Sequence, residues 1–133
     1  MTLKKGYKKL VEEAMADIET ITVEEGLKLQ GDEDVTFFDI RDVRELERTG
    51  TIPGAVHTPR GMLEFWVDPE SPYYKEVFGT GKKLVFFCAA AWRSALAVKQ
   101  LTDMGVPRVC HMDGGFGAWT EAGGPVEEKQ RKS

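Results

Sequence analysis

Residues 83–94 read Lys83-Leu84-Val85-Phe86-Phe87-Cys88-Ala89-Ala90-Ala91-Trp92-Arg93-Ser94. The part from Leu84 to Cys88 is apolar throughout, which predicts a strand covered on both faces, as in a parallel sheet. A helix is expected from Ser94 to Met104, ending at Gly105. Because ligands of open parallel sheets bind at the carboxyl ends of the strands, Cys88 and the loop after it mark the candidate site.

Predicted strands and helices alternate on both sides of this segment. Strands are expected over residues 35–40, 56–57 and 109–111, and helices over residues 7–18, 23–29, 43–48 and 116–122. Thr22 with Glu25 has the pattern of a capping box, and Asp42 can cap the helix that follows it. Residues 60–78 are aromatic-rich and contain two prolines, which favours short helices with loops. The alternation predicts an α/β fold around a central parallel sheet.

Composition indicates one folded domain. The chain has 133 residues, of which 41% are hydrophobic and 30% charged, which is enough for a core without disulfides or a structural metal. The formal net charge of -4 gives no footprint for nucleic acid. We expect no secretory leader and no membrane span, and hence a cytoplasmic protein. The few cysteines and histidines lack the spacing of a zinc site, so neither a metal nor another cofactor is expected.

The loop after Cys88 has the properties of an anion cradle. The amides of residues 89–94 can point inward as a nest, and the following helix adds unpaired N–H groups and the positive end of its dipole. Arg93 adds a full positive charge, and the three consecutive alanines let the backbone face a bound group. These features favour the thiolate form of Cys88, which is the nucleophilic form.

Three motifs, in this order along the chain, resemble the rhodanese family. The first motif, similar to the family's upstream signature, consists of Asp39-Ile40-Arg41, Glu45 and Gly50-Thr51-Ile52-Pro53-Gly54-Ala55-Val56-His57. The second, Cys88-x-x-x-x-Arg93-Ser94, is similar to the active-site loop. The third, Asp113-Gly114-Gly115-Phe116 with Trp119, is similar to the C-terminal signature. The resemblance extends from Ile18 to Pro125, and residues 59–65 also resemble a bacterial single-domain branch.

The resemblance implies a rhodanese-like three-layer sandwich, in which the central parallel sheet is flanked by helices. It divides the chain into an N-terminal amphipathic helix extension at residues 1–17, a rhodanese domain at residues 18–126 and a disordered tail at residues 127–133. The amphipathic helix either covers its own domain, which we expect, or meets a partner.

The activity that the resemblance implies is thiosulfate sulfurtransfer without a cofactor. Cys88 takes the outer sulfur of thiosulfate as a persulfide and passes it to cyanide or a thiol. A sulfur-relay protein is a further possible partner, whereas nucleic acid and membranes are not expected. The substrate-binding loop so implied consists of Ala89, Ala90, Ala91, Trp92, Arg93 and Ser94.

Other charged residues are expected to support this site. Asp39 and Arg41 end a strand at the ligand edge, and Arg60 either lines the mouth of the pocket or is a solvated surface residue. Arg93 at a helix N-terminus needs an anionic partner, which is either the substrate or a carboxylate such as Asp39 or Glu45.

Structural roles are expected for Cys110, as a packed thiol, and for His57 and His111. The family loop often has glycine at the position of Ala91. If that position requires a positive φ, alanine there costs roughly 1 kcal/mol or more, which leaves the substrate and the rate open.

Two other functions are consistent with the same residues. A phosphatase or arsenate reductase would use the same fold, but the loop of the related dual-specificity phosphatases resembles C-x-x-x-x-x-R, one residue longer, and suits a larger oxyanion. A sulfur carrier or binding module would use the same persulfide on Cys88, loaded by one protein and drained by another, with poor thiosulfate turnover. An inactive regulatory domain is disfavoured by the presence of Cys88.

Overall fold

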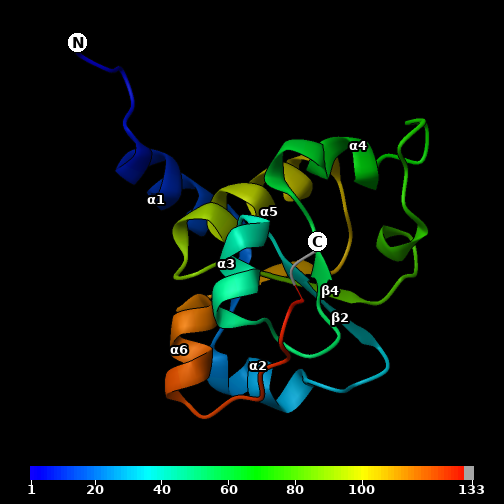
Figure 1. Cartoon of the computed structure of the whole chain (residues 1–133). Coiled ribbons are helices and arrows are strands. Elements are labelled where there is room, and N and C mark those ends of the chain that lie inside the picture. The colour runs from blue at the N-terminus through cyan, green and yellow to red at the C-terminus, as the bar shows by residue number, and fades with distance from the viewer. Residues whose placement is uncertain (131–133) are drawn as a thin grey trace.

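The structure, a computed structural model, describes residues 1–130, and within them five parallel strands form one sheet in the order β1-β5-β4-β2-β3 (Figure 1). The strands are β1 Glu19–Ile21, β2 Val35–Asp39, β3 Val56–His57, β4 Lys83–Phe87 and β5 Val109–Met112. All four neighbouring pairs run parallel, which confirms the predicted central parallel sheet. The apolar strand β4 lies at its centre, between β5 and β2.

Helices cover both faces of this sheet (Figure 1). They are α1 Tyr7–Asp17, α2 Val23–Leu29, α3 Val43–Thr49, α4 Leu63–Val67, α5 Trp92–Met104 and α6 Gly115–Glu121, with short 3-10 helices η1 Arg60–Met62 and η2 Glu76–Phe78. One core joins α4, η2 and α5 to the face of the sheet that carries Phe38 and Phe86. The other core joins α2 and α6 to the face that carries Phe37 and Phe87. The predicted three-layer arrangement is therefore confirmed.

Local sequence signals placed several helix boundaries well. Both capping boxes are present, with the hydroxyl of Thr22 and the carboxylate of Asp42 accepting from the first turns of α2 and α3. The predicted start of α5 at Ser94 is wrong, because the helix begins at Trp92. The amide of Ala95 donates to the carbonyl of Ala91 at 3.0 Å, so helical hydrogen bonding already includes the end of the loop.

Helix α1 covers its own domain, as expected, by packing against α5. Ala14 is fully buried between them. The Tyr7 and Trp92 rings have centroids 4.9 Å apart, and Lys99 pairs with Asp17 at 2.8 Å. The extension is thus joined to the helix that follows the Cys88 loop.

The chain remains attached to the domain beyond α6. Glu127, where the predicted tail begins, exchanges two backbone hydrogen bonds with Thr51, at 2.9 and 2.8 Å. The ordered structure therefore includes Glu127, while residues 131–133 of the predicted tail lie outside the described residues. Within the described part of the chain, no helix has the length and apolar character needed to cross a membrane.

Candidate active site

Cys88 follows directly on β4 and lies beneath the loop that leads to α5. Its residue is only 1% exposed, whereas Ala89 and Ala90 above it are exposed. The backbone amide of Ser94, in the first turn of α5, donates to the Cys88 Sγ at 3.4 Å. The sulfur is therefore held at the base of the loop by the helix N-terminus, an arrangement that suits an anionic sulfur.

Helix α6 holds this loop from the other side. The amides of Phe116 and Gly117 donate to the carbonyls of Cys88, at 2.8 Å, and Ala89, at 3.0 Å. A side chain at Gly115 would place its Cβ 2.4 Å from the Cys88 carbonyl oxygen, and Gly115 also has a φ of +57°. The second glycine of the C-terminal motif is thus required for the close approach of α6 to the loop.

Arg93 is bound by a carboxylate of α3. Its two terminal nitrogens donate to the Glu45 carboxylate at 2.7 and 3.0 Å. The hydrogen bond from Arg93 is the main cause that lowers the pKa of Glu45 below its ordinary value. Of the two carboxylates considered for Arg93, Glu45 and not Asp39 forms the ion pair.

Asp39 and Arg41 form a buried ion pair at 2.8 Å, with side chains 0% and 3% exposed. The Arg41 guanidinium also donates to the Thr49 hydroxyl at 2.9 Å and the Gly50 carbonyl at 2.7 Å. The hydroxyl of Thr51 donates to Asp39 at 2.8 Å. These bonds tie the C-terminal end of α3, the helix that carries Glu45, to the end of β2.

Arg60 and Arg93 line one pocket beside the loop, together with Arg41 and His57; its volume is about 410 Å³. Arg60 is half exposed and pairs with Glu64 at 2.9 Å. Arg60 thus lines a pocket while remaining partly in solvent, so features of both expected positions are present. All three arginines of this pocket are paired with carboxylates.

The loop itself has no left-handed alanine. Ala91 has φ -157° and ψ -26°, so the expected strain of alanine at a positive φ is absent. Trp92 is exposed and lies against Tyr7 of α1 rather than over Cys88. The alanine in place of glycine is thus accommodated without left-handed backbone.

His111, for which a structural role was expected, lies near Cys88, a neighbourhood that the sequence interpretation missed. Its Nδ1 lies 3.0 Å from the Ser94 Oγ, which in turn lies 3.5 Å from the Cys88 Sγ. His111 is fully buried on β5, and burial lowers its pKa. The only available signal was its place near the end of a strand, before the Gly114-Gly115 turn, since nothing local reveals that β5 pairs with β4.

Cys110 lies on the opposite face of the sheet from Cys88. It is fully buried there, and burial raises the pKa of its thiol to about 12. Both cysteines are free thiols. Residues 1–130 contain no group of three or more acidic, histidine or cysteine side chains placed to hold a metal ion.

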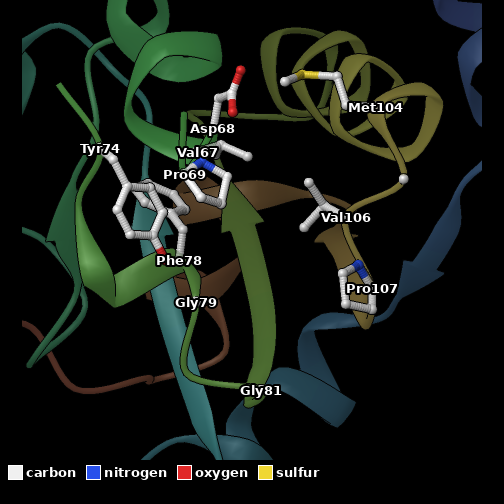
Figure 2. Close-up of a pocket in the computed structure, with 11 residues that line it drawn as sticks. Val67, Asp68, Pro69, Tyr74, Phe78, Gly79, Gly81, Met104, Val106 and Pro107 are labelled. Carbon is white, nitrogen blue, oxygen red and sulfur yellow. The ribbon is translucent and has the colours of Figure 1, made fainter. Parts of the chain in front are cut away.

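A larger pocket, of about 600 Å³, lies away from this site (Figure 2). Its wall includes Phe78 of η2 and Met104, Val106 and Pro107 around the end of α5. No residue of the loop from Cys88 to Ser94 lines it. This pocket, although larger, is therefore not the one that adjoins Cys88.

The fold and the site define an α/β protein in which a buried cysteine follows the central strand and accepts a hydrogen bond from the first turn of the next helix. The model of the rhodanese-like domain family matches residues 22–122, so the chain belongs to that family.

Three relatives bear on what this site does. A protein of unknown function from Rhodopseudomonas palustris, described as a possible tyrosine phosphatase, is 52% identical with a TM-score of 0.92, over 96% of this chain and 98% of its own. The polysulfide-sulfur transferase homodimer of Wolinella succinogenes is 32% identical with a TM-score of 0.69, over 94% and 89%. The human thiosulfate:glutathione sulfurtransferase is 28% identical over 113 residues, 80% of this chain and 97% of its own.

Proposed function

We propose that this protein is a sulfurtransferase that carries sulfur as a persulfide on Cys88. The observation that supports this most directly is the Cys88 sulfur at the base of a four-residue loop, with the Ser94 amide donating to it at 3.4 Å. A persulfide extends the Cys88 side chain by one sulfur atom, for which the loop amides are candidate donors. The named activities of two relatives, sulfur transfer from thiosulfate and from polysulfide, agree with this chemistry.

The reaction takes place in two displacement steps. The Cys88 thiolate attacks the outer sulfur of thiosulfate, the sulfur–sulfur bond of thiosulfate breaks, and sulfite leaves with the bonding electron pair. Cyanide or a thiolate then attacks the outer sulfur of the persulfide, and Cys88 leaves as a thiolate. The two steps balance without a cofactor, because the sulfane sulfur alone is transferred.

Two features of the site favour an anionic donor. Arg60 and Arg93 line the pocket beside the loop, and although each is paired with a glutamate, both can offer remaining N–H donors to an anion. The loop amides and the first turn of α5 supply donors for a sulfur anion. A reducing compartment such as the cytoplasm would keep Cys88 as a thiol, and we include that location in the proposal.

Phosphatase activity is the second candidate, and the description of the Rhodopseudomonas palustris relative favours it. Four residues separate Cys88 from Arg93, which fits a single sulfur atom better than a phosphate group. In addition, both terminal nitrogens of Arg93 are bound to Glu45, whereas an arginine that clamps a phosphate must offer them to the substrate. Both features rank sulfur transfer above phosphate hydrolysis.

The deciding test compares the wild-type chain with Cys88→Ser, measuring thiocyanate formed from thiosulfate and cyanide. We expect turnover in the wild type and none in the variant, because an alcohol cannot form a persulfide, while circular dichroism shows an unchanged fold. Glutathione as acceptor and polysulfide as donor extend the assay to the substrates of the relatives. Hydrolysis of an aryl phosphate by the wild type, without thiocyanate formation, would reverse the ranking.

A protein-to-protein sulfur carrier would give a different result. Thiosulfate turnover would be poor, but incubation with a cysteine desulfurase would add the mass of one sulfur atom to the peptide that contains Cys88. A wild-type protein with neither turnover nor this adduct would contradict both forms of the proposal.

A further inference from the structure

A buried chain of polar atoms connects Cys88 to the neighbouring strand. The Cys88 Sγ lies 3.5 Å from the Ser94 Oγ, and the Ser94 Oγ lies 3.0 Å from His111 Nδ1. The other ring nitrogen, Nε2, lies 3.1 Å from the sulfur of Met15 on α1. Cys88 is 1% exposed, and Ser94 and His111 are fully buried, so the contacts among these three side chains are shielded from water, while Met15 is partly buried.

The contact with Met15 decides which nitrogen of His111 carries hydrogen. A thioether sulfur can only accept, so Nε2 donates to it and carries the hydrogen of the neutral ring. His111 Nδ1 is then an acceptor, and the hydroxyl of Ser94 donates to it. This leaves the lone pairs of the Ser94 Oγ for the S–H of Cys88, so the Cys88 thiol and the Ser94 hydroxyl both donate in the direction of His111.

One other acceptor competes for the Ser94 hydrogen. The carbonyl oxygen of Ala91 lies 3.1 Å from the Ser94 Oγ. If the hydroxyl turned to Ala91, the buried Nδ1 of His111 would lose its only donor among its contacts in the described residues. An unpaired buried acceptor costs about 1–3 kcal/mol, which favours the orientation toward His111.

We propose that His111 is a positioning residue that exchanges a proton with Cys88 through Ser94; this rests on the proposed role of Cys88 as the nucleophile. The S–H bond of Cys88 breaks as its proton passes to the Ser94 Oγ, and the former hydroxyl proton of Ser94 passes to His111 Nδ1. The products are a thiolate, a neutral serine and an imidazolium. An isolated buried anion is costly, whereas an adjacent cation offsets much of that cost.

The charges around the ring are compatible with this exchange. Burial is the main cause that lowers the pKa of His111, while the nearby Asp113 acts in the opposite direction, so at neutral pH the ring is neutral and able to accept a proton. Besides Asp113, the elements packed against it carry charged side chains that are engaged in ion pairs: Arg93 of α5 with Glu45, Asp17 of α1 with Lys99, and Glu19 of β1 with Lys83.

The first experiment follows the ultraviolet absorbance of the Cys88 thiolate against pH. Cys110 does not interfere near neutral pH, because burial raises the pKa of its thiol to about 12. His111→Asn keeps a hydrogen-bonding group near the Nδ1 position but cannot take up a proton, and Ser94→Ala cuts the relay while leaving the backbone donor of residue 94 in place. We expect the midpoint of Cys88 ionisation to rise by about one pH unit in each variant.

The matched control is His57→Asn. His57 is the other histidine of the chain, and its Nε2 contacts the carbonyl of Arg41 at 2.7 Å rather than Ser94. The Cys88 midpoint should not move in this control. Unchanged midpoints in folded His111→Asn and Ser94→Ala would overturn the relay and leave His111 a purely structural role.

A second measurement uses the wild-type protein alone, so its result does not depend on whether a variant folds. Nitrogen NMR of His111 in the wild type should show Nδ1 unprotonated wherever Cys88 is a thiol and protonated in the fraction of molecules that hold the thiolate at neutral pH. That Nδ1 proton should be lost at higher pH, as the pair gives up its one shared proton. A ring that carries its hydrogen on Nδ1 in the neutral state would overturn the proposal. Neither measurement uses sulfur transfer, so a shifted midpoint in a protein without transferase activity would reject the proposed function and retain the relay.

Discussion

At the scale of single residues, Gly115 determines how closely the C-terminal motif meets the catalytic loop. It lies at a φ of +57°, and an added Cβ would lie 2.4 and 2.5 Å from the carbonyl oxygens of Cys88 and Ala90. These atoms belong to the backbone of the loop that surrounds the sulfur, so they cannot move aside without changing the site.

We therefore predict that Gly115→Ala lowers the free energy of unfolding by about 2 kcal/mol or more and reduces thiosulfate turnover at least about tenfold. Gly105→Ala is the matched control, because Gly105 also has a positive φ, of +89°, but nothing lies within 4 Å of the added Cβ. It should lose about 1 kcal/mol from backbone strain alone and keep its activity. Equal activity loss in the two variants would show that strain, and not the contact with the loop, is responsible.

At the scale of elements, the ion pair of Arg93 with Glu45 connects α5 to α3. The Arg93 side chain is 46% exposed and the Glu45 side chain 22%, so solvent screens the pair and limits its contribution to stability. Its main effect is geometric, because it holds the start of α5, and with it the Ser94 amide, in place beside Cys88.

Glu45→Gln should lower the free energy of unfolding by about 0.5 kcal/mol at neutral pH, as measured by urea denaturation. The pKa of Glu45 is lowered in the folded state from its ordinary value of 4.5. The stabilisation is therefore complete above that value and is lost as the pH falls through the lower, folded-state pKa. The difference between wild type and variant should accordingly vanish in acid.

Glu47→Gln is the control for this prediction, since Glu47 lies in the same helix without an ion pair in the described part of the chain. A difference that stays constant down to strongly acidic pH, or one that Glu47→Gln reproduces, would contradict the assignment of the effect to the pair with Arg93.

At the scale of the whole molecule, the segment after α6 returns to the residues that directly follow α3. Glu127 forms two backbone hydrogen bonds with Thr51, whose hydroxyl donates to the buried Asp39. The indole nitrogen of the fully buried Trp119 donates to the carbonyl of Pro125 at 2.8 Å. The C-terminal segment is thus connected, through Thr51, to the hydrogen-bond network at the end of β2.

A chain that ends at Gly124 should be less stable by about 2 kcal/mol or more, because the Trp119 indole and the Thr51 backbone lose their partners. A chain that ends at Glu128 keeps these bonds and serves as the control. Denaturant midpoints that coincide for the two truncated chains would show that water replaces the lost bonds without cost.

Much of the fold could be predicted from the order of residues alone. The apolar run of β4, the capping boxes at Thr22 and Asp42 and the strand-to-helix transition at Cys88 all depend on neighbours a few residues apart. The same local logic located Cys88 as the candidate nucleophile and the following loop as its cradle. It misjudged the first turn of α5, because no capping side chain marks Ala91.

The contacts that complete the site depend on the tertiary structure. Glu45 meets Arg93 across 48 residues of sequence, and His111 meets Ser94 across 17. Parallel strands are joined through helices, so neighbours in the sheet are distant in the chain and carry no local pattern that pairs them. The sequence by itself thus determined the elements and the candidate cysteine, Cys88. Only the folded chain decided which side chains surround it, because strand order β1-β5-β4-β2-β3 brings β5 and β2 to the two sides of β4.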